Sequence, residues 1–151
     1  MITTTFTALG KAEPKGSTRS FVPRHSKTGH AVTTSANKNL KPWESVVRSE
    51  AVAAGLRPVH AAVRVGIRFF FARPKYHFTT KGGIKPAMVH APHLVTPDVD
   101  KLARAVLDGL TGVAYHDDKQ VVGFTELEKC YVPEGGTPCA IITVTQLTEL
   151  E

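Results

Sequence analysis

The sequence has little of several features that define specialised protein classes. Two cysteines in 151 residues are too few for a disulfide-stapled scaffold. No apolar run approaches the roughly 20 residues that a membrane-spanning helix requires. The first residues, MITTTFTALGKAEPKG, lack the basic and apolar segments of a signal peptide. We therefore expect a cytoplasmic globular protein with no membrane association, forming a single domain over residues 1–151.

Acidic residues are scarce in the first two-thirds of the chain. Residues 1–97 hold 15 Lys/Arg and three Asp/Glu, whereas residues 98–151 hold four Lys/Arg and ten Asp/Glu. Residues 51–97 contain no acid at all. An excess of this kind suits a polyanion, because Lys and Arg that contact phosphates release counterions from nucleic acid. The candidates for DNA contact are Lys11, Lys15, Arg19, Arg24, Lys27, Arg68, Arg73, Lys75, Lys81 and Lys85.

Two segments have no clear periodicity. The basic N-terminal segment 10–38 is punctuated by Gly, Pro and Ser, and we interpret it as a loop or ragged hairpin that lies on phosphates. A solvated, disordered arm is the alternative. Residues 74–95 form a long loop, and a loop of this length in a compact domain is usually functional or disordered.

The remaining segments predict six elements. Periodicity of 2 indicates strands, and apolar residues at helical spacing indicate helices, with Trp43 on the core face of the first helix. In order they are strand Ile2–Leu9, helix Asn39–Ala54, strand Val59–Arg73, a helix from Val99, strand Gln120–Val132 and strand Cys139–Leu147. This order predicts a mixed α/β or α+β fold, a small mixed sheet flanked by helices.

Cys130 and Cys139 stand on either side of the sequence PEGGTP, where we expect a hairpin turn containing Gly135 and Gly136. A disulfide across the two strands is conceivable in an oxidising compartment, but we favour two reduced thiols.

His90 and His93 have a spacing that could bind zinc, with His77, His116 or a cysteine as a further ligand. Pro92 lies between them and no CxxC pair accompanies them, so this hypothesis ranks last.

The clearest periodic signal is TPDVDKLARAVLDGLTG, residues 96–112. Apolar residues from Val99 onward fall on one helical face, and Asp98 precedes the helix after a proline. At that place Asp98 can converge with Asp100, and a helix N-terminus favours both carboxylates. Hard oxygen ligands without cysteine select Mg²⁺ or Mn²⁺.

A second acidic pair, Asp117 and Asp118, precedes the next strand, so one of them could return to the same end of the sheet and complete the site. Arg104, one turn after Asp100, could neutralise charge on a phosphodiester. The alternative is an ordinary solvated ladder of Asp100, Arg104 and Asp108 on the helix surface.

The stretch TPDVDKLARAVLDGLTGVAYHDDKQVV resembles the signature of the RusA family of Holliday-junction resolvases, P-D-x-D-N-L-x-K-x-x-x-D-x-L followed by D-D-x-Q-V. The resemblance implies a RusA-like fold and a homodimer that makes paired incisions in four-way DNA junctions. It implies that Asp98, Asp100 and Asp118 bind the catalytic metal, Mg²⁺ or Mn²⁺, with Asp117 in support.

Two positions depart from this signature. Lys101 stands where asparagine is usual, and Arg104 stands where lysine is usual. Arginine keeps the charge but is a poor proton donor. From the sequence we predict a Mg²⁺-dependent DNA endonuclease acting on branched DNA, with a non-catalytic junction-binding or architectural protein as the alternative.

Overall fold

The computed structural model describes all residues except 17, 22–28, 30–31, 36 and 149–151. Its centre is a four-stranded mixed sheet with the strand order β1-β6-β4-β5. Strand β6 is antiparallel to β1 and to β4, whereas β4 and β5 are parallel. The strands are β1 (Ile2–Leu9), β4 (Val63–Phe71), β5 (Val121–Tyr131) and β6 (Cys139–Gln146).

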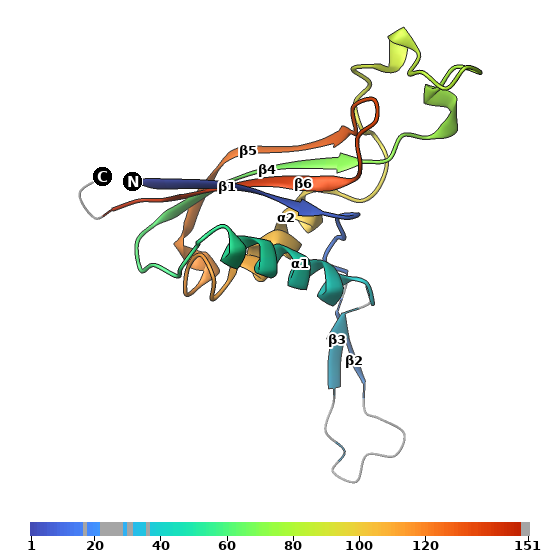
Figure 1. The fold of residues 1–151 in the computed structure, drawn as a ribbon. Coiled ribbons are helices and arrows are strands. Elements are labelled where there is room, and N and C mark those ends of the chain that lie inside the picture. The colour runs from blue at the N-terminus through green and yellow to red at the C-terminus, as the bar shows by residue number, and fades with distance from the viewer. Residues whose placement is uncertain (17, 22–28, 30–31, 36, 149–151) are drawn as a thin grey trace.

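Two helices, α1 (Leu40–Ala53) and α2 (Val99–Leu110), cover one face of this sheet (Figure 1). The alternation predicted for β4 is confirmed, since Val63, Val65, Ile67 and Phe69 are fully buried beneath the helices. Trp43 lies in the core, as its helical phase predicts. These features confirm the predicted α+β class, a small mixed sheet with helices. No helix in the described part of the chain has the length and hydropathy needed to cross a bilayer.

The helices approach each other closely at Gly109. A Cβ atom there would lie 3.2 Å from the backbone oxygen of Glu44 and 3.2 Å from Cγ1 of Val47. Glycine at this position therefore lets the C-terminal end of α2 pack tightly against α1.

The predicted hairpin between the last two strands is wrong, because β4 lies between β5 and β6. Phe70 pairs with Cys130 on one side and with Cys139 on the other. Two strand spacings place the cysteine Cα atoms about 9–10 Å apart, beyond the span of a disulfide. Both cysteines are free, which agrees with the favoured interpretation of two thiols.

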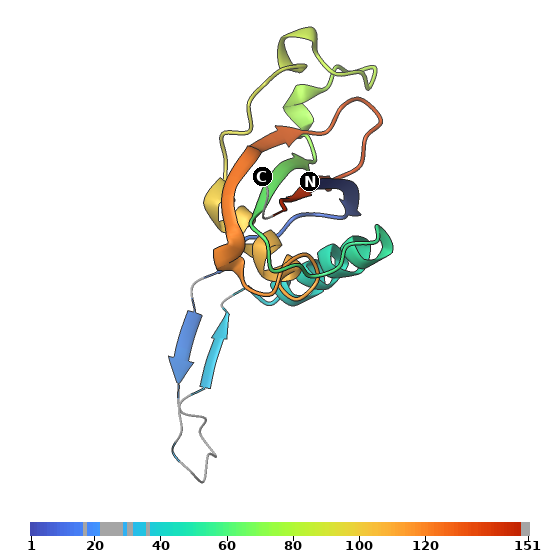
Figure 2. The same ribbon diagram turned by 90° about the vertical axis from the view of Figure 1, so that its left-hand side faces the viewer.

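The basic N-terminal segment contains a separate antiparallel ribbon of β2 (Thr18–Phe21) and β3 (Val32–Ser35). The ribbon projects away from the sheet and its helices (Figure 2), so the predicted ragged hairpin is confirmed. Arg19 lies in β2, opposite Thr34. Arg24 and Lys27 lie outside the described residues.

The long loop 74–95 has local structure of its own. It contains two short 3₁₀ helices, η1 (Lys75–His77) and η2 (Pro86–Met88), and an isolated bridge between Phe78 and Ile84. Arg73 donates hydrogen bonds to the carbonyl oxygens of Val132, Met88 and Val89 at 2.6–3.0 Å. One half-buried guanidinium thus joins the start of the loop to residues 88–89 and to the turn after β5.

Candidate active site

Asp98 occupies the N-cap position of α2 without acting as a cap. Its backbone is extended, with φ of −73° and ψ of 140°, and its side chain makes no capping hydrogen bond. The side chain is 61% exposed, and its carboxylate lies 3.9 Å from Nζ of Lys101. The carboxylate of Asp98 therefore faces solvent beside a cation instead of completing the helix.

Lys129 of β5 holds the turn that carries Asp98. Its Nζ donates hydrogen bonds to the carbonyl oxygens of Val95, at 2.8 Å, and Pro97, at 2.9 Å. These bonds connect the sheet to the residues immediately before α2. Lys129 was not singled out from the sequence, because its partners are backbone atoms more than 30 positions earlier.

Arg104 links α2 to the second acidic pair. Its Nη1 donates a hydrogen bond to Oδ2 of Asp118 and lies 3.6 Å from Oδ1 of Asp108. Partial burial opposes the charged form of Arg104, but the hydrogen bond and the charge of Asp118 outweigh that effect and raise the pKa of Arg104. Arg104 therefore remains a permanent cation between two carboxylates.

Asp117 shapes the turn before β5. Its Oδ1 accepts a hydrogen bond from the backbone N–H of Lys119 at 2.9 Å, and this bond lowers the pKa of Asp117. Gln120 completes a capping box by accepting from the N–H of Asp117, at 3.0 Å. The amide of Gln120 also donates to the carbonyl oxygens of Val59 and Ala61, at 2.7 and 2.9 Å. This network holds the turn that presents Asp118.

The acids are spread along α2 and the turn before β5, and they do not form a closed cage. Among the residues that the structure describes, no three His, Cys, Asp or Glu side chains are grouped closely enough to hold one metal ion. Arg104, the partner of Asp118, lies six positions after Asp98, or about 9 Å along the helix axis. Asp100, which lies between Asp98 and Arg104 in the sequence, is exposed and makes no ion pair within the described part of the chain.

The donor chemistry nevertheless fits Mg²⁺. The ion is usually held by one or two carboxylates together with water and substrate phosphate, and here the donors are exposed carboxylate oxygens. The zinc hypothesis finds no such support. His93 is buried against Phe71 and Tyr131, whereas His90 is exposed.

Seven of the ten predicted DNA-contacting residues have described side chains, and they divide into two groups. Three of them are engaged within the protein: Lys15 pairs with Asp108 at 2.9 Å, Arg68 pairs with Glu128 at 2.6 Å, and Arg73 holds the long loop. Four others are exposed, namely Lys11, Lys75, Lys81 and Lys85.

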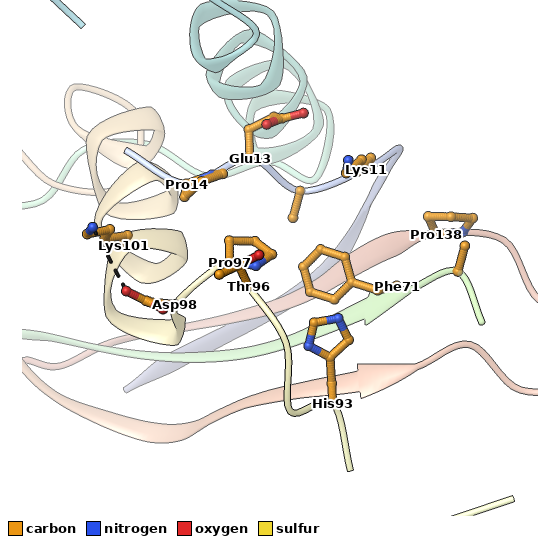
Figure 3. A pocket seen from close by; sticks show the side chains of 12 residues that line it. Lys11, Glu13, Pro14, Phe71, His93, Thr96, Pro97, Asp98, Lys101 and Pro138 are labelled. Carbon is orange, nitrogen blue, oxygen red and sulfur yellow. Dashed lines mark ion pairs between the residues drawn. The ribbon is translucent and has the colours of Figure 1, made fainter. Parts of the chain in front are cut away.

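A cavity of about 650 Å³ opens beside Asp98 (Figure 3). Its walls come from the N-terminal segment, the end of β4, the turn before α2, and α2 itself. It is lined by Lys11, Ala12, Glu13, Pro14, Phe71, Ala72, His93, Thr96, Pro97, Asp98, Lys101 and Pro138.

The fold and this site together define an α+β protein in which exposed acids lie among basic elements, as expected for a protein that acts on a polyanion. The family model of endodeoxyribonuclease RusA matches residues 11–143. The chain therefore belongs to the RusA family of endodeoxyribonucleases, and the resemblance seen in the sequence is confirmed. A search of curated proteins found no match.

Proposed function

We propose that the protein is a Mg²⁺-dependent endonuclease that resolves four-way DNA junctions by paired phosphodiester hydrolysis, and that it acts as a homodimer. The observation that carries this proposal is the exposed carboxylate of Asp98, which the helix does not use as a cap, in a chain of the endodeoxyribonuclease family. A two-fold symmetric dimer matches a junction with two equivalent strands to cut.

Asp98, Asp100 and Asp118 would hold the metal. Bound Mg²⁺ supplies an activated water and stabilises negative charge on the phosphate. Lys101, within 3.9 Å of Asp98, contributes a positive charge where the phosphodiester approaches. Arg104 orients Asp118 and exchanges part of that ion pair for the phosphate when DNA binds.

The proposal predicts the behaviour of Asp98→Asn and Asp118→Asn. Each variant should lower the cleavage rate about 100-fold or more, because each loses a negative ligand from the metal site. Junction affinity should be retained or increased, because each substitution removes a negative charge from a phosphate-binding surface. Cleavage is followed on a labelled four-way junction with Mg²⁺ and with EDTA, and affinity is measured by gel shift in EDTA.

Glu50→Gln is the matched control, since it removes an exposed acid of α1 outside the site. It should cut at the wild-type rate. Undiminished cutting by either aspartate variant would contradict the site assignment, and sedimentation as a monomer on the junction would contradict the dimer.

A non-catalytic junction-binding protein is the second candidate. It is favoured by the ion pairs of Asp98 with Lys101 and of Asp118 with Arg104, which satisfy both acids without metal. The two functions are separated by the products, because only the nuclease yields paired nicks that depend on Mg²⁺.

A further inference from the structure

The cavity beside Asp98 has the lining of a ligand site. Ala12, Phe71, Pro97 and Pro138 give it apolar walls. Two lysines, Lys11 and Lys101, and two acids, Glu13 and Asp98, supply its charged groups (Figure 3). Its volume of about 650 Å³ lies within the range of small-ligand pockets. An apolar cleft with cations at its edge suits a ligand that is part aromatic base and part phosphate.

His93 is an unpaired polar group in the wall of this cavity. The residue is only 8% exposed, and its Nδ1 is enclosed without a hydrogen-bond partner. Its ring lies 4.6 Å from the ring of Phe71 and 4.9 Å from that of Tyr131. Burial, with the charge of Lys129, lowers the pKa of His93, so the ring is neutral at pH 7 and carries one donor and one acceptor.

The walls are held in place before any ligand arrives. On one side the segment 11–14 is fixed at both ends, because Gly10 N–H donates to the carbonyl of Pro138 and Lys15 N–H donates to that of Lys101, each at 3.0 Å. On the other side Lys129 holds the turn before Asp98. A cavity whose walls are already fixed loses little entropy when it is filled.

We propose that this cavity binds one unstacked nucleotide of the DNA strand that is cut, with its base against Phe71 and His93 and its phosphate near Lys11 and Lys101. The proposal rests on the proposed function, since Asp98 both lines the cavity and belongs to the catalytic acids. A strand whose scissile phosphate lies at Asp98 has a neighbouring nucleotide within reach of this opening. Bases removed from a duplex stack gain contact with aromatic side chains and polar edges in such pockets.

The first experiment locates the nucleotide without requiring cleavage. Four-way junctions carry 2-aminopurine at each position flanking the cut, and fluorescence is recorded with the wild-type protein in EDTA. One position on each cut strand should change markedly on binding, because its base leaves the stack. Junction binding with no such position would overturn this proposal alone, and absence of junction binding would overturn the proposed function as well.

The second experiment connects the nucleotide to the cavity. Removing the base at the identified position should weaken wild-type binding about 10-fold, the order expected for one lost stacking contact. Ala72→Trp fills the cavity from an exposed position in its lining. The same base removal should then change the affinity of this variant for the junction less than about twofold, because both changes remove the same contact. Ala53→Trp, at an exposed position of α1 outside the lining, should behave like the wild type. Equal effects of base removal in the wild type and Ala72→Trp would overturn the proposal.

His93→Phe tests the polar contact separately, since it keeps a ring beside Phe71 and removes both nitrogens. Removing the base should still weaken junction binding by this variant. Its junction affinity should, however, be the same with any of the four bases at that position. An unchanged preference in His93→Phe, with a preference present in the wild type, would remove His93 from the proposed site.

Discussion

Single side chains outside the acidic motif and within it determine how its acids are presented. Lys129 comes from β5 and hydrogen-bonds two carbonyl oxygens of the turn before α2, whereas Gln120 clamps the turn that carries Asp118. The acids themselves were predictable, because carboxylates at fixed spacing form a recognisable motif. The hydrogen bonds that support them were not, because the residue type of Lys129, or of Gln120 within the motif, does not show which backbone carbonyls the side chain binds.

Lys129→Met tests this support at the scale of the residue. Removing Nζ frees the carbonyls of Val95 and Pro97, so Asp98 should be held less accurately and kcat should fall about 10-fold with junction affinity unchanged. Single-turnover cleavage and gel shift in EDTA measure the two quantities. Lys129→Arg should restore part of the rate, since its guanidinium can donate to the same carbonyls.

Lys119→Met is the control for this substitution. Lys119 is exposed, its charge acts on Asp117, and its hydrogen bond to the acidic turn comes from its backbone N–H, which the substitution keeps. A Lys129→Met enzyme as fast as Lys119→Met would show that the two hydrogen bonds do not position Asp98.

At the scale of the element, the spacing of apolar residues predicted the individual helices and strands, whereas the order of the strands along the chain did not predict how they pair. The α2 helix and the buried alternation of β4 follow directly from the spacing of apolar residues. The pairing of β5 with β6 was wrongly predicted because adjacency in sequence favours a hairpin, whereas here β4 is inserted between them. The arrangement of the proposed catalytic acids could not be predicted for a related reason. It depends on where the turn before β5 lies relative to α2, and the pattern within each element does not contain that information.

The loop 74–95 makes the stability of the protein sensitive to pH. Arg73 Nη1 lies 3.1 Å from Nδ1 of His77, and arginine only donates, so Nδ1 accepts and the ring is neutral. Burial, with the charges of Arg73 and Lys85, lowers the pKa of His77. His77 therefore takes up a proton near pH 6.5 in the unfolded chain, but only at lower pH in the folded chain. The free energy of unfolding consequently falls as pH decreases below about 6.5.

Urea unfolding at pH 7 and pH 5 measures this effect. His77→Gln keeps an acceptor for Arg73 and cannot titrate, so its stability should fall less between the two pH values than that of the wild type. His90→Gln, at an exposed ring, should retain the wild-type difference. Identical pH differences in wild type and His77→Gln would contradict the role of His77.

At the scale of the whole molecule, the formal net charge overstates the positive charge that is available to bind DNA. Lys15 and Arg68 form ion pairs with Asp108 and Glu128, so part of the basic excess is neutralised within the protein. The exposed lysines of the long loop remain, and Figure 1 places that loop beyond one end of the sheet. We expect the loop to supply phosphate contacts on that side.

A triple variant of Lys75, Lys81 and Lys85 to glutamine tests this expectation. Each lost phosphate contact should reduce the slope of log affinity against log salt by about 0.9, so the triple variant should lose up to about 3 units of slope. Fluorescence anisotropy with a labelled junction over a salt series measures the slope. Lys41→Gln with Arg57→Gln, which changes charge near α1, should alter it less, and equal slopes in the triple variant and the wild type would exclude the loop from DNA contact.

The place of β6 in the sheet has a consequence for biosynthesis. Strand β6 is synthesised after β1, β4 and β5, and it joins β1 to β4. A nascent chain that ends between β5 and β6 therefore has all the proposed catalytic acids but lacks the strand that joins β1 to the rest of the sheet. We expect ribosome-bound chains that end before Cys139 to be unable to cut DNA.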